Sequence, residues 1–245
     1  MPNIYFRFKQ FTIYQDRCAM KVGTDGVLLG AWARVKPSAK RILDIGTGTG
    51  LLALMMAQKS HNQATMIDAV EINHPAFFQA RQNFEASPWY ARLKIYPSSI
   101  QKFARIVPYS YDLILTNPPY FHRSHKAKTT ARTQARHSDT LPPQDLLKAV
   151  QKLLQPEGSF QLIMPVEEGL AFQELAKDYS LFCHRILHFK PKPDKAAKRL
   201  LMEFCKFERR GNIEVSELIG RGEDNLHTEE YRSLTKDFYL DSAFS

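Results

Sequence analysis

Cysteine is scarce in this sequence. The 245 residues include three cysteines, Cys18, Cys183 and Cys205, which lie far apart and form no CxxC pair. An odd number of widely spaced thiols does not fit a disulfide framework, so reduced cysteines in a cytoplasmic protein are expected. Each of the three is interpreted as a small core residue.

Long hydrophobic runs are also absent. No stretch of about 18 apolar residues exists, and the opening MPNIYFRFKQ contains no apolar region of a signal peptide. Neither a membrane-spanning helix nor a signal peptide is therefore expected. With no internal repeat or low-complexity segment, the length fits one domain. We expect an N-terminal segment over 1–40 that covers the ligand site, a core over 41–210 and an acidic segment over 211–245 that packs on the core.

Acidic residues are few in two stretches of this basic chain, whose net charge is +9 and whose pI is about 9.4. Residues 122–137 contain five Lys or Arg and no acid, and residues 190–210 contain eight basic and three acidic side chains. Residues 214–241 reverse the sign, with eight acidic and three basic. This balance fits a polyanionic partner such as a nucleic acid.

From residue 41 onward, apolar strand patterns alternate with helix patterns. This alternation implies an α/β fold with a parallel sheet covered on both faces. The last two strands have no helix between them and are expected to form a hairpin, which puts an antiparallel strand near one edge of a seven-stranded sheet. The expected strands are 41–46, 65–72, 92–97, 112–116, 159–165, 184–189 and 199–207, and the expected helices are 51–60, 75–87, 142–158, 167–180 and 228–240.

Such a sheet binds ligands beyond the carboxyl ends of its strands, near the switch in strand order. The first strand ends in LDIGTGTG, where Asp44 precedes Gly46, Gly48 and Gly50. Glycines let a ligand approach the backbone closely. The GxGxG spacing differs from the dinucleotide fingerprint GxGxxG, and an acid before the glycines would repel a diphosphate. Asp44 suits a cationic ligand instead.

Glu71 ends the second strand, about twenty residues after the last glycine, where a carboxylate can accept hydrogen bonds from both hydroxyls of a ribose. Asp44, the glycines and Glu71 together describe a pocket for a nucleoside with a positively charged, amino-acid-like arm. S-adenosylmethionine has that shape and charge.

The fourth strand ends in NPPY, residues 117–120. With this motif the chain resembles the class I S-adenosylmethionine-dependent methyltransferases, whose first and second motifs are similar to DIGTGTG and VEIN. NPPY itself resembles the [DNS]PP[YFW] motif of amino-methyltransferases that act on adenine, cytosine or glutamine amides. The resemblance implies a single Rossmann-like domain with S-adenosylmethionine as cofactor.

The chemistry of the acceptor explains the residue types of NPPY. An exocyclic amine on a ring is a poor nucleophile, because its lone pair is delocalised. The Asn117 side-chain oxygen and the Pro118 carbonyl can each accept one N–H, which pulls the nitrogen toward tetrahedral geometry. Pro118 and Pro119 fix the backbone that holds this carbonyl. Tyr120 offers a face for stacking an extruded base, assisted by Phe121.

Further motifs narrow the resemblance. DRCAMKVGTDGVLLGAW, residues 16–32, resembles a motif that covers the methionine end of the cofactor, which implies contacts from Lys21, Gly23, Thr24 and Asp25. With QNFEASPWYARL (82–93) and ARHSDTL (135–141), the motifs span nearly the whole chain and closely resemble the bacterial valine-tRNA adenine-37 N6-methyltransferase family. That resemblance implies the substrate, an adenine beside the anticodon.

The sequence departs from related enzymes at one position. Where they often have an Asp that binds the amino group of the cofactor adenine, this chain has Ser99, whose oxygen can accept the same bond. Ile72 and Ile100 are candidates for contacts to the adenine ring, although both equally fit a core. Residues expected to hold RNA are two aromatic and five basic side chains, Tyr120, Phe121, Arg123, Lys126, Lys128, Arg132 and Arg136.

Other functions remain open at this stage. A protein glutamine N5-methyltransferase shares NPPY, but that class resembles longer chains with a helical domain before the first motif. A methyltransferase acting on DNA or on another RNA is a further alternative, as is an RNA-binding module with a degenerate fold. No obligate protein partner is inferred. His122 and His125 have helical spacing, yet no Cys or carboxylate completes a metal site, so no metal is expected.

Overall fold

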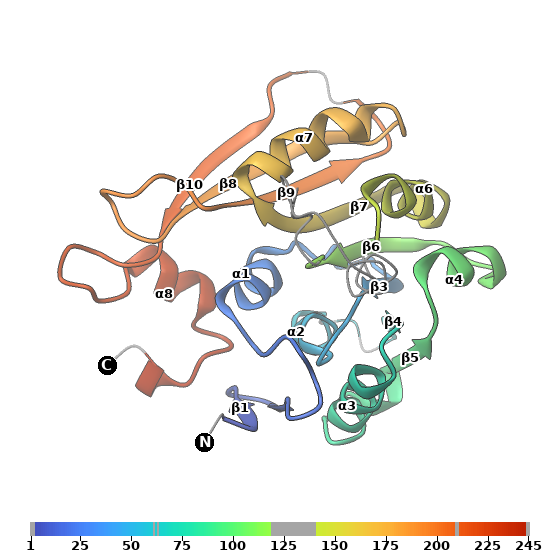
Figure 1. The fold of residues 1–245 in the computed structure, drawn as a ribbon, viewed down its shortest axis with the longest axis horizontal. Helices are drawn as coiled ribbons and strands as arrows, with labels where there is room; N and C mark the ends of the chain where they lie inside the picture. The colour runs from blue at the N-terminus through green and yellow to red at the C-terminus, as the bar shows by residue number, and fades with distance from the viewer. Residues whose placement is uncertain (1–2, 61, 63, 119–140, 209–210, 244–245) are drawn as a thin grey trace, which may run out of the picture.

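The computed structural model describes residues 3–60, 62, 64–118, 141–208 and 211–243. Its centre is an eight-stranded sheet in the order β10-β8-β9-β7-β6-β3-β4-β5 (Figure 1). The strands are β3 (Arg41–Ile45), β4 (Met66–Glu71), β5 (Leu93–Pro97), β6 (Tyr111–Thr116), β7 (Leu154–Pro165), β8 (Phe182–Lys190), β9 (Arg199–Cys205) and β10 (Glu214–Ile219). A separate antiparallel hairpin consists of β1 (Tyr5–Arg7) and β2 (Thr12–Tyr14).

Every strand of the large sheet except β9 runs in the same direction. β9 is antiparallel to both β7 and β8, whereas the other neighbouring pairs are parallel. The carboxyl ends of the seven other strands therefore lie at one edge, hereafter the carboxyl edge. The α/β class, the mostly parallel sheet and the β8–β9 hairpin are as predicted from the sequence.

Helices cover both faces of the sheet (Figure 1). They are α1 (Thr24–Trp32), α2 (Leu51–Lys59), α3 (His74–Glu85), α4 (Ile100–Ile106), α6 (Pro143–Leu153), α7 (Val166–Lys177) and α8 (Glu229–Thr235), with short 3-10 turns at Tyr90–Arg92 and Asp241–Ala243. Side chains alternate along β3, so that Ile42 packs in the core beside α1, α2 and α3 whereas Leu43 and Ile45 pack beside α4, α6 and α7. One sheet thus carries two hydrophobic cores.

Three expected elements differ in the structure. The sheet has eight strands rather than seven, because β10 pairs parallel to β8 at the edge. The helix expected over 142–158 ends at Leu153, and Pro156 and Gly158 lie within β7, where the pairing with β6 jumps from Tyr111–Leu154 to Leu113–Ser159. The C-terminal helix covers Glu229–Thr235 rather than 228–240. Pro and Gly here mark an irregular strand, not the end of a helix.

Candidate active site

The carboxyl ends of β4, β3 and β6 lie side by side. β3 is between the other two, with Ile45 opposite Val70 on β4 and Thr116 on β6. The Val70 carbonyl accepts hydrogen bonds from Gly46 N and Thr47 N at 2.8 and 3.1 Å. The loop after β3, Glu71 at the end of β4 and Asn117 after β6 therefore share one edge, at the switch in strand order between β3 and β6.

The glycine loop, residues 46–50, leaves open space on its outer side. Gly46 and Gly48 have φ values of +68° and +55°, in the left-handed region that favours glycine, and a Cβ at either position would meet nothing within 4 Å. Gly50 differs, because a Cβ there would lie 2.6 Å from the Phe84 ring of α3. The first two glycines thus allow a ligand to approach, and the third allows α3 to pack closely.

Asp44 is fully buried below this loop and retains one unpaired oxygen. Its Oδ2 accepts hydrogen bonds from Thr47 Oγ1 at 2.5 Å and Ala53 N at 3.2 Å, while Oδ1 has no hydrogen-bond partner. Burial raises the pKa of Asp44 to about 7, the two hydrogen bonds oppose the rise, and Glu71 adds to it. An unpaired buried carboxylate oxygen fits a ligand that brings a positively charged N–H donor.

Glu71 is 8% exposed and lies against the glycine loop. Its Oε2 accepts a hydrogen bond from Gly48 N at 2.9 Å, and Oε1 accepts one from Asn73 N at 2.8 Å. Each carboxylate oxygen has a second acceptor position. Glu71 can therefore orient the loop and still accept hydrogen bonds from the two hydroxyls of a ribose.

The N-terminal candidates gather at the start of α1. Gly23 is the N-cap residue, followed by Thr24 and Asp25 in the first turn, and Lys21 Nζ donates a hydrogen bond to Asn3 O at 3.4 Å. Asp25 Oδ2 forms an ion pair with Arg199 Nε at 2.9 Å. Arg199 begins β9 opposite Pro165, the last residue of β7, so Asp25 lies near the carboxyl edge.

The three candidates for the adenine ring have different surroundings. Ser99 is the N-cap residue of α4, and its hydroxyl accepts a hydrogen bond from Lys102 N at 3.3 Å. Ile100 is 4% exposed and packs in the core beside α4, whereas Ile72 is 56% exposed directly after Glu71. Of the two isoleucines, Ile72 is the one whose side chain is accessible to a ligand.

The structure describes only the first half of NPPY. Asn117 is half-buried and Pro118 is buried immediately after β6. The other candidates of this region lie outside the described residues, and their roles stay predictions: Pro119, Tyr120, Phe121, Arg123, Lys126, Lys128, Arg132 and Arg136.

Comparison with known proteins identifies the family. The family model described as "Methyltransferase small domain" matches residues 24–177. A tRNA1(Val) (adenine(37)-N6)-methyltransferase of Trichodesmium erythraeum is 51% identical over 98% of this chain and 99% of the relative. A protein of the same name from Parabacteroides distasonis is 45% identical over the same shares.

The chain belongs to this family of tRNA adenine N6-methyltransferases.

Solved structures of more distant proteins share its fold. A predicted O-methyltransferase, Atu636 of Agrobacterium tumefaciens, matches 87% of this chain and 96% of its own with a TM-score of 0.69 at 17% identity. TYW2 of Pyrococcus horikoshii, solved in complex with MeSAdo, matches 83% of this chain and 71% of its own with a TM-score of 0.54 at 13% identity. These similarities show that the fold is the Rossmann-like class I methyltransferase fold.

Some residues at the site were not found by sequence reasoning. Thr47 pairs with Asp44, and Asn83 of α3 bonds to the Thr49 carbonyl at 2.8 Å. Asn83 lies within the motif 82–93, but its bond to the loop could not be predicted from that motif, because its partner is 34 positions away. In the part of the chain that is described, no group of three or more His, Cys, Asp or Glu side chains is placed to hold a metal ion. Within the same residues, no helix is long and apolar enough to cross a membrane.

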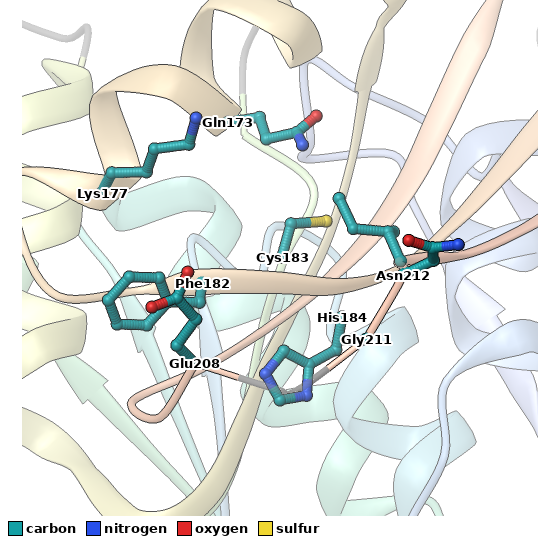
Figure 2. A pocket seen from close by; sticks show the side chains of 9 residues that line it. Gln173, Lys177, Phe182, Cys183, His184, Glu208, Gly211 and Asn212 are labelled. Carbon is teal, nitrogen blue, oxygen red and sulfur yellow. The ribbon is translucent and has the colours of Figure 1, made fainter.

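A cavity of about 170 Å³ lies elsewhere, between α7, β8 and the segment after β9 (Figure 2). It is lined by Phe182, Cys183 and His184 at the start of β8 and by Gln173 and Lys177 of α7. Phe182 pairs with Cys205 at the end of β9, so the cavity is at the sheet edge opposite the glycine loop. It is separate from the candidate active site.

Proposed function

We propose that this protein transfers a methyl group from S-adenosylmethionine to the N6 amine of adenine 37 in a valine tRNA. The observation that carries the proposal is the meeting of Asp44, the glycine loop, Glu71 and Asn117 at one edge of the sheet. The names of relatives that are 43–51% identical over nearly the full chain support the choice of acceptor. A tRNA substrate also fits a cytoplasmic location.

In this proposal Asp44 and Glu71 bind opposite ends of the cofactor. Asp44 Oδ1 accepts a hydrogen bond from the amino group of the methionine arm, and Glu71 accepts hydrogen bonds from the ribose hydroxyls. The cofactor, when bound, supplies an electrophilic methyl group on a sulfonium. The glycine loop contributes space rather than charge, since Gly46 and Gly48 leave their outer side open.

Asn117 and Pro118 act on the acceptor amine. The Asn117 side-chain oxygen and the Pro118 carbonyl each accept one N–H of the adenine amine, which directs its lone pair toward the methyl group. The amine that results is cationic and readily loses its proton to solvent, so no general base of high pKa is required. Catalysis is then mainly positioning and charge complementarity.

Basic residues beside this edge support an RNA substrate. The β8–β9 connection contains Lys192, Lys195 and Lys198, and it lies at the carboxyl edge because β8 is parallel to β7. Lys195 forms an ion pair with Asp194 at 2.8 Å, and Lys190 forms one with Glu217 at 2.9 Å. We propose that this connection contacts tRNA phosphates beyond the methylated base.

The experiment that tests the function is incubation with radiolabelled S-adenosylmethionine and total tRNA from a strain that lacks the enzyme. Nucleoside analysis is expected to show label in N6-methyladenosine, and cleavage mapping is expected to place it at position 37 of a valine tRNA. Label in another nucleoside or position would contradict the proposed acceptor. Label in protein glutamine rather than RNA would favour the N5-methyltransferase alternative.

A further inference from the structure

The segment that connects the N-terminal hairpin to α1 crosses α3. This crossing segment, residues 14–23, is held by two buried amides on one face of α3, Gln79 and Asn83, which are 0% and 1% exposed. Gln79 Oε1 accepts a hydrogen bond from Arg17 N at 3.0 Å. Asn83 pairs with both sides of the Tyr14 backbone: Oδ1 accepts from Tyr14 N and Nδ2 donates to Tyr14 O, each at 2.9 Å.

Asn83 makes one more bond, and it reaches the glycine loop. Its Nδ2 donates to the Thr49 carbonyl at 2.8 Å, so that a single side chain joins the crossing segment to the loop. The next residue, Phe84, packs against Gly50, where a Cβ would lie 2.6 Å from the ring. Both N–H groups and the oxygen of Asn83 are therefore used, as a buried amide requires.

The other end of the crossing segment is held by Gln15. Gln15, which is 4% exposed, accepts a hydrogen bond from Val22 N at 2.8 Å, directly before the N-cap residue of α1. In the middle, burial raises the pKa of the Cys18 thiol to about 11, with further contributions from the negative charges of Glu71 and Asp16. The charge of Glu71, the predicted ribose acceptor, thus acts on the middle of the crossing segment.

We propose that Asn83 is a positioning residue for the cofactor site, because it locks the crossing segment and the glycine loop to the same helix. This inference rests on the proposed function and on the prediction from the sequence that residues 16–32 cover the methionine end of the cofactor. Without Asn83, the Thr49 carbonyl and the Tyr14 peptide lose their partners, and both segments must be ordered when the cofactor binds. That ordering cost lowers cofactor affinity, whereas the transfer step at Asn117 is little affected.

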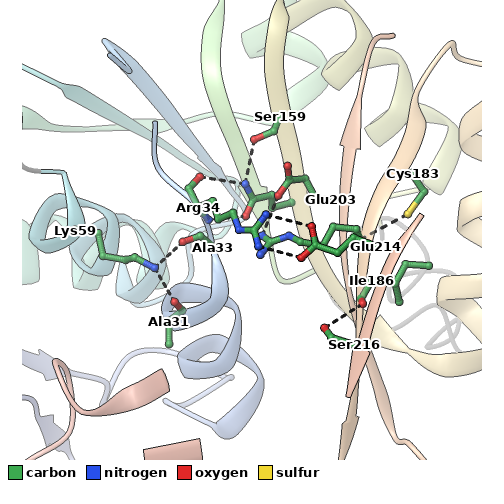
Figure 3. A network of polar contacts seen from close by, with 12 residues as sticks. Ala31, Ala33, Arg34, Lys59, Ser159, Cys183, Ile186, Glu203, Glu214 and Ser216 are labelled. Carbon is green, nitrogen blue, oxygen red and sulfur yellow. Dashed lines mark hydrogen bonds and ion pairs between the residues drawn. The ribbon is translucent and has the colours of Figure 1, made fainter. Parts of the chain in front are cut away.

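Gln161 provides a matched control on β7. It is 0% exposed, its Oε1 accepts from Arg34 N at 3.1 Å, and its Nε2 donates to Arg34 O at 3.2 Å and Ser159 Oγ at 3.0 Å. Figure 3 shows Arg34 and Ser159 within this network. Gln161 therefore makes the same number of bonds as Asn83, and the same bidentate pair with one backbone residue, but away from the glycine loop.

The test compares Asn83→Leu with Gln161→Met by calorimetric titration of S-adenosylmethionine, alongside thermal unfolding of the free chains. Both variants are expected to unfold at a lower temperature. The Kd of Asn83→Leu is expected to rise about tenfold or more, with kcat at saturating cofactor changed less than about twofold, whereas Gln161→Met keeps the wild-type Kd within about twofold.

Asn83→Asp is made in parallel in case Asn83→Leu does not fold. It retains an acceptor for Tyr14 N but removes the donor to Thr49 O, so its Kd is also expected to rise. A folded Asn83 variant with wild-type affinity, or an equal loss of affinity in Gln161→Met, would overturn the positioning role. Failure of the wild-type chain itself to bind the cofactor would instead overturn the proposed function, and this inference with it.

Discussion

Asp44 is a buried carboxylic acid with one oxygen left for a ligand. Burial raises the pKa of its side chain from 3.8 to about 7, which means that the free protein holds it partly protonated at neutral pH. A positively charged ligand at Oδ1 stabilises the ionised form. The proton and the ligand therefore compete for the same carboxyl group.

This competition predicts a pH dependence of cofactor binding. S-adenosylmethionine affinity is expected to rise as pH increases toward about 7, with proton release on binding, because the ligand binds the deprotonated acid. In Asp44→Asn the affinity is expected to be lower at about pH 7.5, and the rise between about pH 5.5 and 7.5 to be absent. Calorimetric titration at several pH values, in buffers of different ionisation enthalpy, measures the affinity and the number of protons released. An unchanged pH profile in the variant would remove Asp44 from the ligand contacts.

At the residue scale, sequence reasoning singled out groups at strand ends and missed groups whose hydrogen-bond partners are distant in the sequence. Asp44, Glu71 and Asn117 lie at strand ends, where a local pattern predicts them. Asn83 lies inside a helix, and its bonds to Tyr14 span 69 positions. Ser99 was predicted as a ligand contact, and the structure adds that its hydroxyl caps α4.

At the scale of elements, α1 depends on tertiary contacts. Seven of its nine residues are buried, and a Cβ at Gly30 would lie 2.3 Å from Met55 Sδ of α2. An apolar helix of this length has no amphipathic period, which explains why no helix was predicted over 24–32. Its last carbonyls are capped by Lys59, whose Nζ donates to Ala31 O at 2.6 Å and to Ala33 O at 2.5 Å (Figure 3).

Lys59→Met is expected to destabilise this helix pair by about 2 kcal/mol near neutral pH, because buried carbonyls lose a charged donor. Burial, together with the positive charge of Arg185, lowers the pKa of Lys59 from 10.5 to about 8. At pH values between these two pKa values, the unfolded chain binds more protons at Lys59 than the folded chain does. Lys59 therefore makes the free energy of unfolding rise with pH in this range.

The difference in stability between the wild-type chain and Lys59→Met is therefore expected to grow between about pH 8 and about pH 10. Urea unfolding at several pH values measures it. A difference that is constant with pH would show that the two chains do not differ in proton binding, and that Lys59 is not held with a lowered pKa.

The edge strand β10 shows another limit of prediction from the sequence. Four of its six residues, Glu214 to Glu217, are exposed, and Glu214 pairs with Arg34 at 3.0 Å while Glu217 pairs with Lys190 at 2.9 Å. Charged residues are typical of protected sheet edges and lack the apolar pattern of a central strand. The acidic composition of residues 214–241 was therefore recognised, but not the strand within it.

At the scale of the whole molecule, the order of elements was enough to predict seven of the eight strands and the edge at which the carboxyl ends meet. A parallel sheet with crossover helices brings its carboxyl ends together whatever the details of the loops. The same rule places the β8–β9 connection and its lysines at that edge. The basic residues of 122–137, which are predicted to bind RNA phosphates, lie outside the described residues.

The proposed contacts between the β8–β9 connection and tRNA phosphates can be tested by the salt dependence of tRNA binding. Replacing Lys192 and Lys198 with Gln is expected to weaken binding and to reduce the slope of log K against log salt by roughly one unit per lost phosphate contact. Lys40→Gln with Lys152→Gln is a matched control, because these exposed lysines precede β3 and β7 at the opposite edge. Equal slopes for both pairs in filter-binding assays would show that RNA is held elsewhere.

In the proposed mechanism three strand ends form one site, where Glu71 holds the cofactor and Asn117 acts on the acceptor amine. Single-turnover methyl transfer to tRNA that lacks the modification, measured across a range of S-adenosylmethionine concentrations, tests this division most directly. Asn117→Ala is expected to slow transfer about a hundredfold at every concentration with an unchanged cofactor Kd. Glu71→Ala is expected to raise the Kd and to regain most of its rate at saturation. A wild-type transfer rate for Asn117→Ala would remove Asn117 from the chemical step, and a wild-type cofactor Kd for Glu71→Ala would remove Glu71 from the cofactor site.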